Sequence, residues 1–573
     1  MHFHKGSQAC LLLLVHAVMI VAGVNFTQCL NDIIQSANAT KNLSGLLDSD
    51  GHPVSSVANA TSISYSLCTS HCGTGQEPFQ WSVFSQEFSA WLLPNLALIS
   101  QLPFGAQYRV DNLMSALLTV GSPALAGYSL FITLLNSRWI NRRFNHSVDH
   151  PNSRFAVSIL SSLQQVPLRF HPDRTHLYSL IALPENDSWW KCLAEFVDYT
   201  HTWSIASATS IAWVIIAYIL TVANSLSDVY ADVQSNGEAS GSMWLWLIPI
   251  VVGWLQLSPK CDFNRLQAAY ERADKHALRT GAADIRTRMP LASSRRALAI
   301  TAKEEDVMSP DEFLTPPIFN YSRSLRWAST AETICLVFKV ASEKAHSLPS
   351  DLGSERAEFD TAIQSDTTRD TDDRESCQDP IMYCAQPGEA QSSHWAPGVF
   401  TRMAIASCAS LALQWGTVGA ALLVGWFTPT TEMGCRAMGY LLYGVISTLI
   451  WMMLLMSSIL AHYSAAYSHR KSLSARVALA LSHFLRWMGK LWAVINFFLV
   501  VLACIFQYSN FYDRCFCNSS VFSRRGAAYT VIIETAAQAG RAKTAWIVAL
   551  VLACTSASSF LGVVYLLLDT VPS

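Results

Sequence analysis

The sequence predicts an all-α protein, a polytopic transmembrane helix bundle of seven or eight spans. Apolar residues make up 51% of the 573 residues and charged residues only 14%, where a soluble domain has about a quarter charged. Residues 258–398 hold 39 of the 80 charged side chains, so the rest of the chain approaches the composition of lipid-embedded segments. This balance excludes a disordered chain and a small disulfide-stapled module. The net charge of −2 argues against a nucleic-acid partner.

The first element is a predicted signal peptide, residues 1–23. Lys5 precedes a short apolar stretch from Ala9 to Val24, and small residues stand at Ala22 and Gly23, as in secretory signals. An uncleaved signal anchor is the alternative. Either version would deliver residues 24–87 to the lumenal or extracellular side.

Residues 24–87 have the composition of an exported, glycosylated segment. They contain four N-x-[ST] acceptor patterns, which is more than chance suggests, although one match alone is weak. The segment also has three cysteines, which usually pair in an oxidising compartment; the odd number leaves their connectivity open. The glycosylation candidates are Asn25, Asn38, Asn42 and Asn59, and the disulfide candidates are Cys29, Cys68 and Cys72.

A metal site at Cys68, His71 and Cys72 would need a second ligand pair, and none follows in the sequence. His146 and His150 stand four residues apart, but Pro151 follows them, so we expect a solvated turn there. We therefore predict no metal site.

Membrane spans need about 20 mostly apolar residues. Windows 88–103 and 242–257 are short, and the first contains Pro94, so it could dip into the membrane without crossing. The first membrane helix group covers 88–257 and the second 399–573. The windows are 88–103, 113–135, 203–224, 242–257, 403–427, 438–461, 488–507 and 544–568.

The distribution of basic residues orients these spans. Placing loops 136–202 and 462–487 and the insert 258–398 inside puts 28 Lys and Arg residues in the cytoplasm and six in the outer loops, as the positive-inside rule requires. Only one of windows 88–103 and 113–135 then crosses fully, which gives seven spans, and eight is the alternative. The N-terminus is expected to be lumenal or extracellular, the C-terminus cytoplasmic, and the membrane the plasma membrane or one of the secretory pathway.

Two outer loops, 428–437 and 508–543, carry further cysteines and one acceptor pattern. We expect Cys435 to pair with Cys515 or Cys517, and Asn518 to be a further glycosylation candidate. Five basic residues in loop 508–543 favour the opposite reading, in which these cysteines stay reduced inside. The patterns at Asn145, Asn186 and Asn320 should remain unmodified because they would face the cytoplasm.

The insert 258–398 is predicted to be mostly disordered and cytoplasmic. The run from Phe263 to Leu278 can form a helix. Residues 297–388 are rich in acidic residues, Ser and Thr, and such a composition cannot bury a core. This part offers a docking segment for a cytoplasmic protein partner.

No enzyme motif is present, so we predict no catalytic residues, no cofactor and no enzymatic activity. The central turns of the spans lack Asp, Glu, Lys and Arg, which argues against proton-coupled transport. Small residues are frequent in the spans, and they favour close helix packing. Gln414 and Trp415 are the mid-membrane positions to test for a ligand, and Ser207 and Ser210 would line a solute path with Gln414.

Two stretches resemble a known group of proteins. Cys68-Thr-Ser-His-Cys72-Gly73-Thr-Gly75, with Phe88-Ser-Ala-Trp91-Leu-Leu-Pro94, is similar to the start of large fungal multi-pass membrane proteins without an assigned activity. Gly434-Cys435-Arg436, with Gly439-Tyr440-Leu-Leu-Tyr443-Gly444, resembles their later span. The resemblance implies the membrane architecture and no mechanism.

Two classes of function fit these observations. The first is a non-enzymatic receptor-like or scaffold protein, with a glycosylated exterior and a cytoplasmic insert. The second is a channel or carrier for an uncharged solute. The only partner that the composition implies directly is the lipid bilayer, and the oligomeric state stays open.

Overall fold

The computed structural model describes most of the chain, except residues 1–23 and most of the insert. The described residues are 24–79, 81, 84–85, 88–104, 109–166, 168–170, 177, 180–181, 186–198, 203–227, 243–258, 263–273, 278–280, 288–290, 298–300, 318–347, 395–467 and 472–568. The predicted signal peptide lies outside them.

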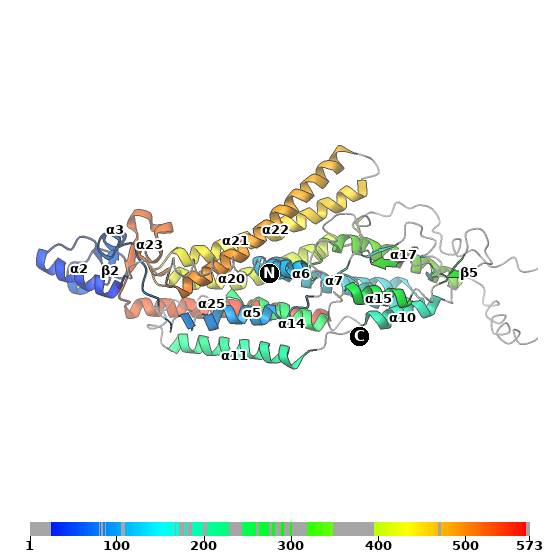
Figure 1. Ribbon diagram of the computed structural model, residues 1–573, viewed down its shortest axis with the longest axis horizontal. Helices are drawn as coiled ribbons and strands as arrows, with labels where there is room; N and C mark the ends of the chain where they lie inside the picture. The colour runs from blue at the N-terminus through cyan, green and yellow to red at the C-terminus, as the bar shows by residue number, and fades with distance from the viewer. Residues whose placement is uncertain are drawn as a thin grey trace, which may run out of the picture.

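The molecule is elongated, with a helix bundle between two folded ends (Figure 1). One end, which we call the dome, consists of residues 24–79 and 509–535. The opposite end contains the second half of α7 and several shorter helices. The main bundle helices are α7 (Pro123–Ser147), α11 (Ile205–Ser227), α20 (Val399–Phe427), α21 (Cys435–Tyr467), α22 (Leu473–Tyr508) and α25 (Ala536–Leu568).

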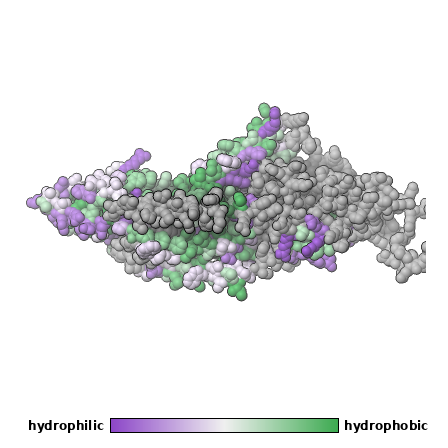
Figure 2. Space-filling model, in the orientation of Figure 1, coloured by the Kyte–Doolittle hydropathy of each residue, from purple (hydrophilic) through white to green (hydrophobic). Residues whose placement is uncertain are grey.

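Among the described residues, five helices are long and apolar enough to cross a membrane, namely α11, α20, α21, α22 and α25. The number becomes six if α6 (Arg109–Gly121) and α7 are counted as one broken span. The prediction of seven or eight spans is therefore wrong. The apolar surface that these helices present across the middle of the molecule implies contact with a lipid bilayer (Figure 2).

Two predicted windows do not form full-length helices. Window 88–103 splits into η3 (Phe88–Leu92) and the seven-residue α5 (Leu93–Ile99). Window 242–257 forms α14 (Leu247–Leu257), whose 11 residues extend about 16 Å, well short of a hydrocarbon core of about 30 Å. The short length of both windows is visible in the sequence, but hydropathy does not show where each helix stops, because an apolar segment stays apolar whether its helix continues or stops.

Window 113–135 is divided at Ser122. The chain bends there by 106° between α6 and α7. Pro123 occupies the first turn of α7 and Ser122 caps it, accepting a hydrogen bond from the backbone N–H of Leu125. Proline lacks a backbone N–H and fits the first turn of a new helix, so this pair of residues starts α7 in a new direction.

Helix α20 is the centre of the bundle and α11 lies at its edge. The most apolar window of α20 is 56% buried, compared with 17% for α11. Helix α20 packs against α7, α21 and α25. Most of α11 faces outward, including Trp213, which is 70% exposed, as expected for a helix that contacts lipid along most of its surface.

The dome begins with α2 (Phe26–Thr40), where Phe26, Leu30, Ile33 and Ala37 form one buried face. The Asn25 side chain caps α2 by accepting from the Gln28 N–H. An antiparallel sheet of order β1–β2–β7 pairs Ile63 with Thr530 and so joins the two parts of the dome. The other dome elements are β1 (Leu46–Leu47), η1 (Val57–Asn59), β2 (Ser62–Ser64), α3 (Tyr65–Leu67), η2 (Cys68–Cys72), α23 (Cys515–Asn518), α24 (Val521–Arg524), η9 (Arg525–Ala527) and β7 (Tyr529–Val531).

The opposite end is built from shorter elements that belong to the first membrane helix group, 88–257, and to the insert, 258–398. Its elements are α8 (Ser153–Ser162), α10 (Asp187–Val197), α15 (Phe263–Ala273), α17 (Ser324–Ser347) and the strand pairs β3 (Leu168–Phe170) with β6 (Leu298–Ile300) and β4 (Leu278–Thr280) with β5 (Arg288–Pro290). Helix α15 covers most of the helix predicted from Phe263 to Leu278.

Helix α17 corrects the prediction of disorder for residues 324–347, which form part of the segment 297–388. Trp327 is buried and its indole N–H donates to the carbonyl of Leu160, at 2.9 Å. Glu332 makes a two-point ion pair with Arg143 of α7, at 2.6 and 3.2 Å. The acidic composition of the whole segment hid one amphipathic helix, whose apolar residues pack on α7. Residues 301–317 and 348–394 lie outside the described part of the chain.

Candidate functional site

Three disulfides fasten the dome to itself and to the bundle. Cys29 pairs with Cys72 inside the N-terminal segment. Cys68 pairs with Cys515 across 447 residues of sequence, and Cys435, the first residue of α21, pairs with Cys517. All six cysteines selected from the sequence are thus engaged. The odd cysteine of the N-terminal segment has its partner in the last loop, which no spacing rule in the sequence indicates.

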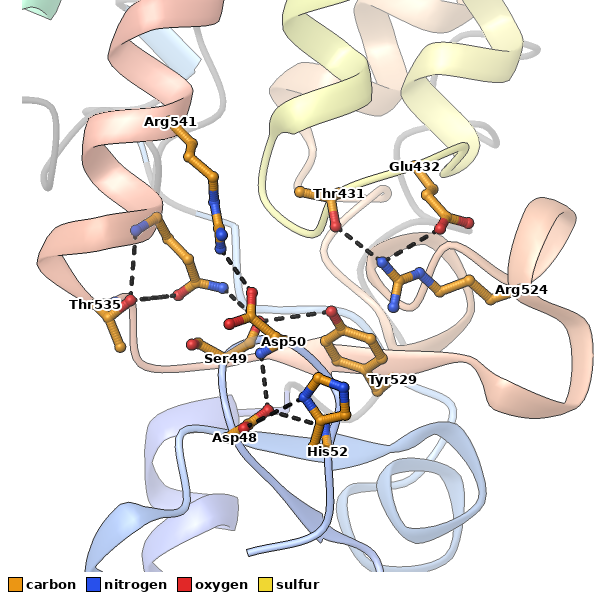
Figure 3. Close-up of polar contacts among 11 residues, drawn as sticks. Asp48, Ser49, Asp50, His52, Thr431, Glu432, Arg524, Tyr529, Thr535 and Arg541 are labelled. Carbon is orange, nitrogen blue, oxygen red and sulfur yellow. Dashed lines mark hydrogen bonds and ion pairs between the residues drawn. The ribbon is translucent and has the colours of Figure 1, made fainter.

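A turn at residues 48–52 rests on the first turns of α25 (Figure 3). Asp50 forms an ion pair with Arg541 at 2.8 Å, and the carbonyl of Ser49 accepts from the Gln538 side chain at 2.8 Å. Gly51 has φ +84°, and a Cβ there would collide with the ring of Tyr529. The turn therefore requires glycine in order to lie flat on Tyr529.

A second set of contacts joins the dome to the loop between α20 and α21. Arg524 donates to the Thr431 hydroxyl at 2.9 Å and lies 3.5 Å from a carboxylate oxygen of Glu432 (Figure 3). The Arg524 guanidinium also stacks on Tyr529, 4.3 Å from the ring centroid. The dome is consequently attached to α20, α21 and α25 by polar contacts as well as by disulfides.

The N-terminal part of the dome continues toward the bundle through residues 76–78. Gln76 donates to the carbonyl of Ser509 at 3.0 Å and accepts from Arg514 at 2.9 Å. The Glu77 N–H donates to the carbonyl of Asp513, at 3.1 Å. Burial, together with the nearby Asp513 carboxylate, raises the pKa of Glu77 to about 7. Burial also raises the pKa of Glu534 to about 7.

These two carboxyl groups should make the dome more stable in acid. Their pKa in the folded protein lies above the ordinary value of 4.5, so the folded state binds these protons more tightly than the unfolded state. Stability is then greatest below pH 4.5 and falls as the pH rises to about 7. We expect Glu77→Gln to reduce this loss by about 1–2 kcal/mol, after allowance for partial exposure.

The measurement is thermal unfolding of the purified protein at pH 5 and pH 8. Protease sensitivity of the dome reports the unfolding. Glu77→Gln should reduce the difference in unfolding temperature between pH 5 and pH 8. The double variant with Glu534→Gln should reduce this difference further. The exposed Glu271 provides the control, as Glu271→Gln. If the double variant lost as much stability between pH 5 and pH 8 as the unchanged protein, the raised pKa values of Glu77 and Glu534 would be contradicted.

The dome has an open groove of about 590 Å³ on its surface. It lies between the end of α2, residues 55–60 and Ile533, so both parts of the dome contribute to it. The residues that line it are Ile34, Ala37, Asn38, Lys41, Leu43, Ser55, Ser56, Val57, Ala58, Ala60 and Ile533. Only Asn38 among these was selected from the sequence, because the groove exists only when distant segments meet.

The break between α6 and α7 is surrounded by polar side chains from three other helices. Gln414 of α20 accepts from the Ala124 N–H at 3.0 Å. Asn496 of α22 donates to the Gly121 carbonyl at 2.7 Å, and Tyr443 of α21 donates to the Val120 carbonyl at 2.7 Å. Backbone groups that a helix break leaves free must find protein partners inside a membrane. These side chains provide them.

Gln414 is fully buried, and its side chain forms hydrogen bonds with α7 and α21. Its amide N–H groups donate to the Gly444 carbonyl at 3.0 Å and to the Thr448 hydroxyl at 2.9 Å, and its oxygen also accepts from Ser447. The Trp415 indole N–H donates to Thr448 at 3.2 Å. Both positions selected as ligand contacts therefore hold helices together.

The structure does not bring the predicted solute-path residues together. Ser207, on α11, donates to the side chain of Gln101, whereas Gln414 contacts α7 and α21. Neither the groove described above nor a small enclosed pocket between α21 and α22, with room for about one water molecule, is lined by Gln414, Ser207 or Ser210.

Among the described residues, no group of three or more His, Cys, Asp or Glu side chains is arranged to hold a metal ion. Cys68 and Cys72 are both in disulfides. His150 is half-buried, and its ring packs edge-on against Phe338 at 5.1 Å. The expected solvated turn at His146 and His150 is wrong in part, because α7 continues to Ser147 and α17 covers His150.

The five glycosylation candidates differ in exposure. Asn25, Asn38, Asn42 and Asn59 are exposed on the dome. Asn518 is only 9% exposed and follows the disulfide-bonded Cys517, while Ser520 of its acceptor pattern is 1% exposed. The structure thus gives Asn518 a packing role that its sequence pattern does not reveal.

Long apolar helices with a folded, disulfide-bonded domain at one end define a multi-pass integral membrane protein. Comparison with known protein families, with curated proteins and with solved structures finds no match to this chain. The resemblance to fungal membrane proteins gains no support from these comparisons and stays a prediction.

Proposed function

We propose that the chain is a receptor-like or scaffold membrane protein without enzymatic activity. The observation that carries this proposal is the contrast between the dome and the bundle. The dome has an open groove of about 590 Å³, while the middle of the bundle is closed around Gln414, a fully buried side chain with hydrogen bonds to α7 and α21. The accessible site is thus outside the bundle.

We further propose that the dome faces the lumen or the cell exterior. Three disulfides support this orientation, because such bonds persist in oxidising compartments. The excess of basic residues in loops 136–202 and 462–487 and in the insert favours a cytoplasmic opposite end. The protein would then reside in the plasma membrane or a membrane of the secretory pathway, and a cytoplasmic protein partner would bind through residues 297–388.

Glycan mapping tests this orientation. We expect each single Asn→Gln change at Asn25, Asn38, Asn42 and Asn59 to remove one glycan. Each loss should reduce the decrease in apparent mass that glycosidase treatment produces. Changing Asn518 should remove none, because the folded dome buries it. Asn145, which is exposed at the opposite end, is the matched control. A glycan on Asn145 with none on the dome would reverse the orientation.

The second candidate is a carrier or channel for an uncharged solute. One observation favours it, the break between α6 and α7 inside the bundle, because interrupted helices often form the binding sites of carriers. Here the freed backbone groups are bonded to Gln414, Tyr443 and Asn496.

Solute flux separates the two candidates. The full chain, reconstituted into vesicles, should pass glycerol, urea and small sugars no faster than empty vesicles do. Saturable flux of any of these solutes, abolished by Gln414→Leu and retained by Gln256→Leu, would favour the carrier and overturn the receptor-like proposal. Gln256 is an exposed glutamine whose side chain donates a hydrogen bond to the Tyr565 hydroxyl.

A further inference from the structure

The groove in the dome has an apolar floor that lacks a covering element among the described residues. Ala37 and Ala60 are buried at its base, and Ile34, Leu43 and Val57 are half-buried around it. Ile533 closes one side and is 44% exposed. The face of the dome that Figure 2 shows is largely hydrophilic. A concave apolar surface in such a domain indicates a binding site, and its volume lies in the range of small-molecule sites.

One charged side chain lies in the groove. Lys41 is the only ionisable residue among those that line it, and no carboxylate of the described residues lies within ion-pairing distance of it. Its backbone is in the left-handed conformation at the end of α2, with φ +57°, which fixes where the side chain leaves the helix. The hydroxyls of Ser55 and Ser56 add hydrogen-bonding groups to the same lining.

We propose that the groove binds a small amphipathic carboxylate. The apolar body of the ligand would cover Ala37, Val57 and Ile533, and its carboxylate would pair with the Lys41 ammonium. Charge complementarity decides the sign of the ligand's charge, because the lining has one cationic residue and no acidic residue. A charge-assisted hydrogen bond at the edge of an apolar surface is the usual way in which such sites orient their ligands.

The position of Ile533 links occupancy of the groove to the bundle. Ile533 comes three residues before α25 begins, and its backbone N–H donates to the carbonyl of Thr61. A ligand between Lys41 and Ile533 would therefore connect the N-terminal segment to the start of α25. This step rests on the proposed receptor function, whereas binding itself does not.

The predicted glycans favour a small ligand over a protein. Asn38 lines the groove, and Asn42 and Asn59 are chain neighbours of lining residues. Glycans on these exposed asparagines would surround the groove and restrict the approach of macromolecules. The glycan on Asn38 is itself the competing occupant, so the test includes the glycosylated protein and the Asn38→Gln variant.

The experiment measures binding of 4-phenylbutyrate and of its neutral amide to the full chain in lipid nanodiscs, by saturation-transfer NMR with empty nanodiscs as the blank. We expect the acid to bind more tightly than the amide. Lys41→Gln should weaken acid binding about threefold to tenfold and leave amide binding unchanged, which corresponds to one charge-assisted contact. Lys41→Arg should restore the preference, and Lys543→Gln, an exposed lysine outside the lining, should have no effect.

A second variant tests the apolar part without touching the charge. Ala58 is exposed in the lining, so Ala58→Phe should be tolerated by the fold and should weaken the acid and the amide alike. Equal affinity for the two probes, no binding of either, or indifference to both variants would overturn the proposal. Binding that appears only in Asn38→Gln would assign the groove to the glycan and would also overturn it. None of these outcomes affects the flux and glycan-mapping tests of the proposed function.

Discussion

Replacing Cys68 and Cys515 together by serine should lower the free energy of unfolding of the dome by about 4–5 kcal/mol. The bond closes a loop of 447 residues, and long loops gain most from closure. Helices that stay in the bilayer restrain the reduced chain, which keeps the effect below the random-coil value. Loss of the bond should also loosen the pairing of β2 with β7, because no other disulfide joins these two parts of the dome among the described residues.

The measurement is denaturant unfolding of the purified protein. Protease sensitivity of the dome reports the unfolding. Cys408→Ser, at an exposed free cysteine, is the control and should change little. Cys435→Ser with Cys517→Ser should cost less than the first pair, about 4 kcal/mol, because its loop is 82 residues long. An effect of the Cys68 and Cys515 pair no larger than that of the control would show that the dome does not depend on this bond.

Gln414→Leu should destabilise the bundle by about 3 kcal/mol, since it leaves several buried polar groups unpaired. The side chain bonds the Ala124 N–H, the Gly444 carbonyl and the Thr448 hydroxyl, and leucine can replace none of these contacts. The Ala124 N–H can only donate and the Gly444 carbonyl can only accept, so the amide has one suitable orientation. Water is excluded from the site, because Gln414 and Ser447 are fully buried.

Unfolding in mixed detergent micelles gives the change in stability, and hydrogen exchange of the peptide containing residues 120–126 gives its location. Exchange there should become faster in Gln414→Leu and stay unchanged in the matched control, Gln256→Leu. Equal stability of the two variants would mean that α6 and α7 hold their angle without Gln414.

Several helices could be predicted closely from hydropathy. Window 403–427 corresponds to α20 and window 203–224 to α11, since about 20 apolar residues are needed to span lipid. Window 488–507 recovers only the second half of α22, which begins at Leu473. The first half carries Arg476 and Arg486, and these charges end an apolar window although the backbone remains helical.

The candidate site could be predicted only in part. The six cysteines were selected because they lie in a segment and two loops predicted to face an oxidising compartment, where cysteines usually form disulfides. The partner of Cys68 could not be chosen, since it lies 447 residues away. Helix α17 was missed because the whole segment 297–388 is acidic, and because its apolar residues, such as Trp327 and Phe338, are buried only when α7, β3 and α21 pack against them.

The sequence by itself determined that this is a multi-pass membrane protein, because apolar length and local composition are properties of single segments. Only the tertiary structure decided the number of long spans, the closure of the bundle around Gln414, and the groove between Lys41 and Ile533. Each of these depends on which distant segments meet. That choice is made by the packing and hydrogen bonding of the folded chain, through contacts such as those of Asn496 with Gly121 and of Ile63 with Thr530.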